Sequence, residues 1–154
     1  MPARRIRKTE RPISKYLEIA DKEYSNRGRS VIAVIDDEAS VRKAVVRLLG
    51  AAGFAVRGFS SAKEFLDTWH FDRPDCLLLD LQMPDISGTE VQRALNVAGA
   101  QFPIIIISAH DAPDLREECL HLGAVAYLCK PLDANALLRA VRPAMGSPAA
   151  RGVQ

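Results

Sequence analysis

Five apolar runs that alternate with segments of helical periodicity constrain the fold of this chain more than any other feature of its sequence. The runs at 31–35 and 103–107 are continuous and rich in β-branched residues, as is typical of strands buried on both faces of a sheet. Between the runs, apolar residues such as Val41, Val45 and Leu48 recur at helical spacing. We therefore expect strands at 31–35, 54–58, 76–80, 103–107 and 125–128, and helices at 38–51, 62–70, 89–97, 113–122 and 134–142.

Strands that are each followed by a helix predict an α/β fold with a parallel sheet. Right-handed crossovers leave few topologies for such a sheet, and 154 residues are too few for an eight-stranded barrel. A doubly wound open sheet remains. The expected folded part, residues 30–145, is large enough to bury a core without disulfides or a structural metal.

The charge is distributed unevenly along the chain. Residues 1–30 carry nine Lys/Arg and four Asp/Glu, a net of about +5, whereas residues 31–154 carry twelve and fifteen, a net of about −3. We interpret residues 1–29 as a basic N-terminal extension, either partly helical over 12–20 or disordered, and residues 146–154 as a disordered tail.

The chain has an odd number of cysteines, Cys76, Cys119 and Cys129, and none has the C-x-x-C spacing of a metal-binding pair. We expect reduced thiols in a cytoplasmic protein. No apolar run approaches the roughly 20 residues of a membrane-spanning helix, and no signal peptide is expected.

Polar residues stand where the expected strands end. Asp36 and Asp37 follow the first strand, Asp80 ends the third, Ser108 follows the fourth and Lys130 follows the fifth. In open parallel sheets, ligands bind at this carboxyl edge of the strands. Each residue alone is an ordinary cap or turn residue, and an acidic pair after a strand commonly caps the next helix. Their joint placement on one edge favours a functional site.

Three carboxylates held close together repel one another, and a hard cation such as Mg²⁺ relieves that repulsion. One of the carboxylates can then attack phosphorus, while the Lys130 ammonium and the Ser108 hydroxyl neutralise and bind the phosphoryl oxygens. The residues therefore predict phosphoryl transfer to a carboxylate that depends on Mg²⁺.

Four segments resemble the CheY-like receiver domains of bacterial response regulators. The matching segments are 34–38, 79–88, 108–109 and 127–131. The resemblance runs from about residue 31 to 141. It implies the sheet order 2-1-3-4-5, which is the order of this family and of other flavodoxin-like folds.

The resemblance implies a role for each residue of the acidic cluster. Asp80 accepts the phosphoryl group, and Asp37 and Asp80 bind Mg²⁺ directly together with the backbone carbonyl of Gln82. Asp36 contributes through water. The resemblance also implies a cis peptide bond at Lys130–Pro131.

It further implies a conformational switch. Phosphorylation draws Ser108 towards the phosphoryl group and lets Tyr127 turn inwards, and the small Ala109 leaves access to Asp80. Gln82 and His110 flank the site and tune the loss of the phosphoryl group. His110 can also be read as a metal ligand or a base, but we interpret it as a solvent-facing loop histidine.

The sequence is most similar to receivers of the FixJ type, and we expect a stand-alone receiver without an attached DNA-binding domain. The implied partners are a sensor histidine kinase or a histidine phosphotransfer protein, an unknown downstream protein, and a second copy through the face of the fourth helix, fifth strand and fifth helix. We expect the protein to catalyse its own phosphorylation and dephosphorylation, and not to act as an enzyme that turns over a separate substrate.

Three alternatives stay open at this point. The chain can serve as a phosphorelay intermediate or phosphate sink, or its basic residues 1–30 can bind nucleic acid, although four acids in that segment speak against this. A phosphatase of the haloacid dehalogenase type also uses an aspartyl nucleophile. That family places Asp-x-Asp after its first strand, which the adjacent Asp36 and Asp37 do not match.

Overall fold

The computed structural model of this protein describes residues 30–146. Its elements alternate along the chain in the order β1 (Val31–Ile35), α2 (Ala39–Ala51), β2 (Ala55–Phe59), α3 (Ala62–Thr68), β3 (Cys76–Asp80), α4 (Gly88–Val97), β4 (Ile104–Ser108), α5 (Pro113–His121), β5 (Ala126–Cys129) and α6 (Ala134–Gly146). The helix predicted at 12–20 lies outside the described residues, and so does the tail predicted at 146–154, apart from Gly146, which ends α6.

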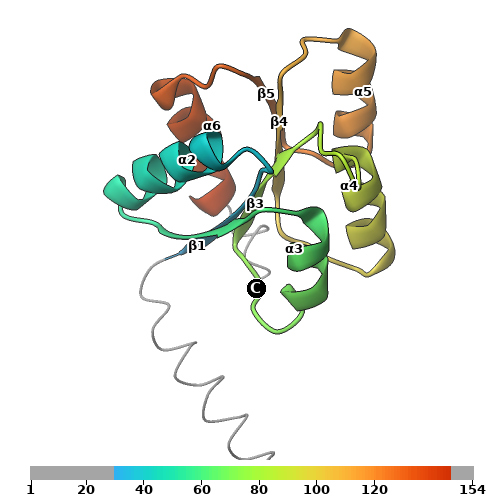
Figure 1. Cartoon of the computed structure of the whole chain (residues 1–154), viewed down its shortest axis with the longest axis horizontal. Coiled ribbons are helices and arrows are strands. Elements are labelled where there is room, and N and C mark those ends of the chain that lie inside the picture. Colours follow the sequence, from blue (N-terminus) through green and yellow to red (C-terminus); the bar gives the residue numbers. More distant parts are fainter. Residues whose placement is uncertain (1–29, 147–154) are drawn as a thin grey trace, which may run out of the picture.

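The five strands form one sheet in the order β2-β1-β3-β4-β5, and all neighbouring strands are parallel. The predicted fold class and strand order are therefore confirmed. Helices α2 and α6 cover one face of the sheet, and α3, α4 and α5 cover the other (Figure 1).

Each face of the sheet carries its own apolar core. Alternate residues of the central strands point to opposite faces, so Ile32 and Val34 of β1 pack towards α2 and α6, whereas Ala33 and Ile35 pack towards the other three helices. All five residues of β1 are buried. This double burial explains why the central strands are apolar throughout.

Helix ends follow local signals that were largely visible in the sequence. The Ser61 side chain accepts a hydrogen bond from the backbone N–H of Glu64 at the start of α3, and Asp133 caps α6 through the N–H of Ala136. Gly53, with a φ of +102°, follows the end of α2, where a residue with a side chain is strained.

The last helix is longer than predicted. We expected it to end at residue 142, before Pro143, but α6 continues through that proline to Gly146. Ala144 and Met145 of the extra turn are buried in the core between α2, α6 and the sheet. The apolar contacts of this turn outweigh the backbone hydrogen bond that proline cannot donate.

In the part of the chain that is described, no helix combines the length and the apolar content needed to cross a bilayer.

Candidate functional site

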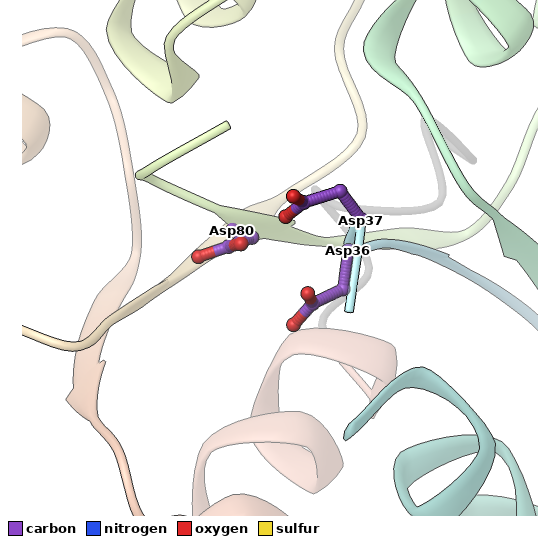
Figure 2. A group of neighbouring side chains, drawn as sticks. All are labelled: Asp36, Asp37 and Asp80. Carbon is purple, nitrogen blue, oxygen red and sulfur yellow. The ribbon is translucent and has the colours of Figure 1, made fainter. Parts of the chain in front are cut away.

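The carboxyl edge of the sheet brings together the residues that the sequence placed at strand ends. Asp36 and Asp37 directly follow β1, and Asp80 is the last residue of the neighbouring strand β3. Figure 2 shows the three carboxylates gathered at the ends of these two strands. The register pairs Asp80 with Ile107 and Ser108 with Cys129, so Ser108 and Lys130 reach the same edge.

The three carboxylates form a compact donor set. One oxygen from each of Asp36, Asp37 and Asp80 lies within 4.8 Å of the others. Asp36 and Asp80 are each only 2% exposed, whereas Asp37 is exposed. Oδ1 of Asp80 is buried and has no hydrogen-bond partner among the described residues. A buried carboxylate oxygen that accepts no hydrogen bond and has an ammonium group no nearer than 3.5 Å, beside two further hard oxygen ligands, suits a divalent cation.

The acidic pair after β1 does not cap the next helix. The N-cap residue of α2 is Glu38, and its side chain makes no capping hydrogen bond. Oδ1 of Asp36 instead accepts a hydrogen bond of 2.9 Å from the backbone N–H of Glu38, which tightens the turn. The helix-cap interpretation of Asp36 and Asp37 is therefore wrong, and both acids remain available to the edge of the sheet.

Lys130 lies between two of these carboxylates. Its Nζ is 3.1 Å from Oδ2 of Asp36 and 3.5 Å from Oδ1 of Asp80, and the lysine side chain is 17% exposed. The Lys130–Pro131 peptide bond is cis, as predicted. The lysine therefore enters the acidic cluster from β5, two strands away from β3.

Burial and charge change the titration of this cluster. Burial, and then the charge of Asp36, raise the pKa of Asp80 from 3.8 to about 7, although Lys130 acts in the opposite direction. Burial lowers the pKa of Lys130, but the hydrogen bond to Asp36 and the charges of both acids outweigh burial and raise it. Without a cation, the site thus holds Asp80 close to the point of protonation at neutral pH.

The residues after β4 are held by the side chain of Gln82. Oε1 of Gln82 accepts hydrogen bonds from the Ser108 hydroxyl at 3.2 Å and from the backbone N–H of Ala109 at 3.1 Å. The same hydroxyl lies 3.1 Å from the carbonyl oxygen of His110 and accepts from the His110 N–H at 3.0 Å. The side chain of His110 is exposed, in agreement with a loop histidine.

Tyr127 is already turned inwards in this structure. Only 6% of the residue is exposed, and its hydroxyl donates a hydrogen bond of 2.8 Å to the carbonyl oxygen of His110. Our expectation that phosphorylation turns Tyr127 inwards stays a prediction; the structure shows the ring buried beside the loop after β4. A neighbour on α5 favours this buried position: the guanidinium of Arg116 lies 4.9 Å from the centre of the tyrosine ring.

Sequence reasoning missed two arginines near the site. Arg116 contacts Tyr127, and Nη1 of Arg42 donates a hydrogen bond of 2.7 Å to the backbone carbonyl of Asp36. The only sequence signal for Arg42 is its place one helical turn after the acidic pair. That signal alone does not distinguish it from Lys43 beside it.

A family model and curated relatives of this chain point to the same protein family. Residues 32–142 match the model of the response regulator receiver domain. The transcriptional regulatory protein FixJ of Azorhizobium caulinodans is 40% identical over 124 residues, which cover 80% of this chain and 58% of that protein. The response regulator protein TodT of Pseudomonas putida is 40% identical over 116 residues, covering 75% of this chain and 51% of that protein.

A solved structure extends the match to three dimensions. The crystal structure of a response regulator receiver protein from Burkholderia phymatum is 42% identical, with a TM-score of 0.66 over 82% of this chain and 98% of that one. The chain thus spans nearly the whole of a solved receiver, but only about half the length of the curated relatives it matches.

Proposed function

Since this chain belongs to the response regulator receiver family, we propose that it accepts a phosphoryl group on Asp80 in a reaction that depends on Mg²⁺. One observation carries the proposal: the buried Asp80 carboxylate has an oxygen without a hydrogen-bond partner among the described residues, and two further acids and one lysine surround it. An acid that served only as a turn residue needs neither a buried position nor an ammonium 3.5 Å away.

In the proposed reaction, a carboxylate oxygen of Asp80 attacks phosphorus. A new P–O bond forms, and the bond between phosphorus and the donor's leaving group breaks. Lys130 neutralises negative charge on the transferred group. The Ser108 hydroxyl exchanges its hydrogen bond with Gln82 for one to a phosphoryl oxygen.

Asp36, Asp37 and Asp80 are the residues that would hold Mg²⁺, with the backbone carbonyl of Gln82 as a further ligand. When bound, the ion neutralises the carboxylates and the phosphoryl oxygens together. The residues fit this ion, because the donors are hard carboxylate oxygens and their mutual distances are within 4.8 Å. We propose autocatalytic phosphorylation and dephosphorylation of this residue, and no turnover of a separate substrate.

The test is phosphorylation by a small phosphodonor such as acetyl phosphate, with and without Mg²⁺, measured by intact-protein mass. The wild-type chain is expected to gain one phosphoryl group only with Mg²⁺, and Asp80→Asn to gain none. Asp85→Asn is the matched control, because Asp85 is an exposed acid on the same loop. Undiminished labelling of Asp80→Asn, or equal loss in Asp85→Asn, refutes Asp80 as the acceptor.

We propose that the donor in the cell is a sensor histidine kinase or a histidine phosphotransfer protein. The output that we propose is a contact with a downstream protein, with a phosphorelay step as the alternative. Homodimerisation through α5, β5 and α6 stays a prediction.

A role in gene regulation is the second candidate. It is favoured by the relatives that carry the names transcriptional regulatory protein and response regulator protein, about half of whose length this chain matches. If the basic residues 1–30 bind DNA directly, a version that begins at Gly28 and so lacks most of them will lose affinity in a salt-titrated binding assay. Equal weak binding by both versions excludes direct binding through that segment.

A further inference from the structure

Asp37 is the least restrained acid of the cluster. Its side chain is exposed, and within residues 30–146 no hydrogen bond or ion pair reaches its carboxylate. Asp36, by contrast, accepts from the N–H of Glu38 and pairs with Lys130. The position of the Asp37 carboxylate therefore depends on the backbone that carries it, and above all on the peptide unit that joins Asp36 to Asp37.

That peptide unit is held by Arg42. Nη1 of Arg42 donates a hydrogen bond of 2.7 Å to the carbonyl oxygen of Asp36, and the N–H of Asp36 donates to the carbonyl of Phe59 at 3.1 Å. A hydrogen bond from a charged donor is stronger than one between neutral groups. The backbone of Asp36 is thus fixed on one side by the edge strand β2 and on the other by a side chain of α2.

Helix α2 brings Arg42 to this carbonyl by its own geometry. The backbone N–H of Arg42 donates to the carbonyl of Glu38 at 3.0 Å, which is the first full helical hydrogen bond after the acidic turn. A residue at this position lies one turn into the helix and faces back towards the N-terminus. The long, unbranched side chain then spans the remaining distance to Asp36.

Gly58 leaves the space that the arginine side chain occupies. It lies on β2, paired with Val34 of β1. A Cβ atom at position 58 would lie 3.2 Å from both Cγ and Cδ of Arg42, which is tighter than ordinary van der Waals contact. A side chain at position 58 would therefore displace the aliphatic part of Arg42 from the path that leads to the Asp36 carbonyl.

We propose that Arg42 is a positioning residue for divalent-cation binding, which sets the Asp36–Asp37 peptide so that the Asp37 carboxylate faces the cation, and that Gly58 provides its space. The inference rests on the proposed function, because it assumes that the acidic cluster binds Mg²⁺. Arg42 touches neither the cation nor the phosphoryl group in this account. It acts through one backbone carbonyl.

The test measures Mn²⁺ affinity by electron paramagnetic resonance, with Mg²⁺ competition, on the full chain. Arg42→Met keeps an unbranched apolar side chain and removes the donor, and we expect it to weaken Mn²⁺ binding roughly five- to tenfold. Arg42→Lys restores part of the affinity, because the ammonium is still a donor. Gly58→Val is expected to weaken binding in the same direction as Arg42→Met.

Two substitutions serve as matched controls. Arg47→Met removes an exposed arginine from the same helix, and Gly50→Ala adds a Cβ at a position with nothing within 4 Å. Both are expected to leave the affinity for Mn²⁺ within twofold of the wild-type value.

The outcomes separate this inference from the proposed function. If the wild-type chain binds no Mn²⁺, both the proposed metal-dependent function and this inference are refuted. If the wild-type chain binds Mn²⁺ and Arg42→Met binds it equally well, only the inference is overturned. Thermal unfolding in the presence of a chelator tests whether Arg42 only stabilises the fold. If Arg42→Met has a lower Tm than the wild-type chain but the same affinity for Mn²⁺, the inference is also overturned.

Discussion

The hydroxyl of Ser108 lies 3.2 Å from Oε1 of Gln82 and donates a hydrogen bond that joins the end of β4 to the loop after β3. The same oxygen accepts from the N–H of Ala109. A hydroxyl has only one proton, so Ser108 cannot donate to Gln82 and to a phosphoryl oxygen at once. A phosphoryl oxygen therefore competes for the Ser108 proton with two acceptors, Oε1 of Gln82 and the carbonyl oxygen of His110, which lies 3.1 Å away.

Gln82→Met removes one of these two acceptors and keeps the length of the side chain. We expect the variant to bind beryllofluoride, an analogue of the phosphoryl group, about fivefold more tightly, since one neutral hydrogen bond contributes about 1 kcal/mol. The measurement is calorimetric titration with Mg²⁺ present. Gln101→Met, at an exposed position away from the site, is the control. Weaker binding by Gln82→Met would mean that Gln82 stabilises the phosphorylated state instead.

The raised pKa of Asp80 predicts how stability depends on pH. Burial, then the charge of Asp36, raise that pKa to about 7 in the folded chain, so folding favours the protonated acid. The contribution of Asp80 to stability is fully present below about pH 4 and is lost as pH rises through about 7. Asp80→Asn should therefore stabilise the fold at pH 8 by about 1–3 kcal/mol and lose that advantage towards pH 4.

Urea unfolding of both chains from pH 4 to pH 8, with a chelator present, measures this difference. Comparing the two chains at each pH removes the contribution of the other acids. A difference in unfolding free energy that stays constant across this range contradicts the raised pKa of Asp80.

Lys130→Met removes the ammonium that lies 3.1 Å from Asp36 and 3.5 Å from Asp80. We expect phosphorylation by acetyl phosphate to slow roughly 100-fold, as when one preorganised donor is lost from a reaction site. The rate of labelling is followed by mass spectrometry. Lys63→Met is the control, because the exposed Lys63 pairs with Asp67 on α3. A rate within twofold of wild type would exclude Lys130 from the reaction.

Gly88→Ala tests the close approach of α4 to the end of β3. A Cβ at position 88 would lie 2.9 Å from Cα of Leu81 and 3.1 Å from the carbonyl oxygen of Asp80. Because both atoms belong to the backbone, we expect the variant to lose about 1–3 kcal/mol of unfolding free energy. Gly50→Ala, in open space, should lose none. Equal stability of the two variants in urea would show that the loop at Leu81 shifts without cost.

Tyr127→Phe removes the hydroxyl that donates to the carbonyl oxygen of His110. We expect a loss of about 1 kcal/mol in the free energy of unfolding, and about 0.5–1 kcal/mol for Arg116→Ala, which removes the cation over the ring. Chemical denaturation measures both, with the exposed Arg142 changed to Ala as the control. If Arg116→Ala unfolds like wild type, the arginine does not hold Tyr127 in its buried position.

Strand ends were the part of the site that sequence reasoning could predict. In a parallel sheet with helical crossovers, every strand ends at the same edge, so Asp36, Asp80 and Lys130 meet once the strands are identified. The strand order came from the family resemblance, since apolar periodicity identifies strands but not their neighbours. The end of α6 was placed too early, because the last turn is stabilised by the burial of Ala144 and Met145 against other elements, which the spacing along the chain does not reveal.

The sequence by itself determined the α/β class, the extent of the strands to within one residue and the types of residue at the carboxyl edge, because these depend on periodicity and local caps. Only the tertiary structure decided which partner each side chain has. The bond from Arg42 to Asp36, the space at Gly58 and the buried ring of Tyr127 arise where a helix and a strand pack side by side. Such contacts depend on distances of a few ångströms between separate elements, and no spacing along the chain encodes them.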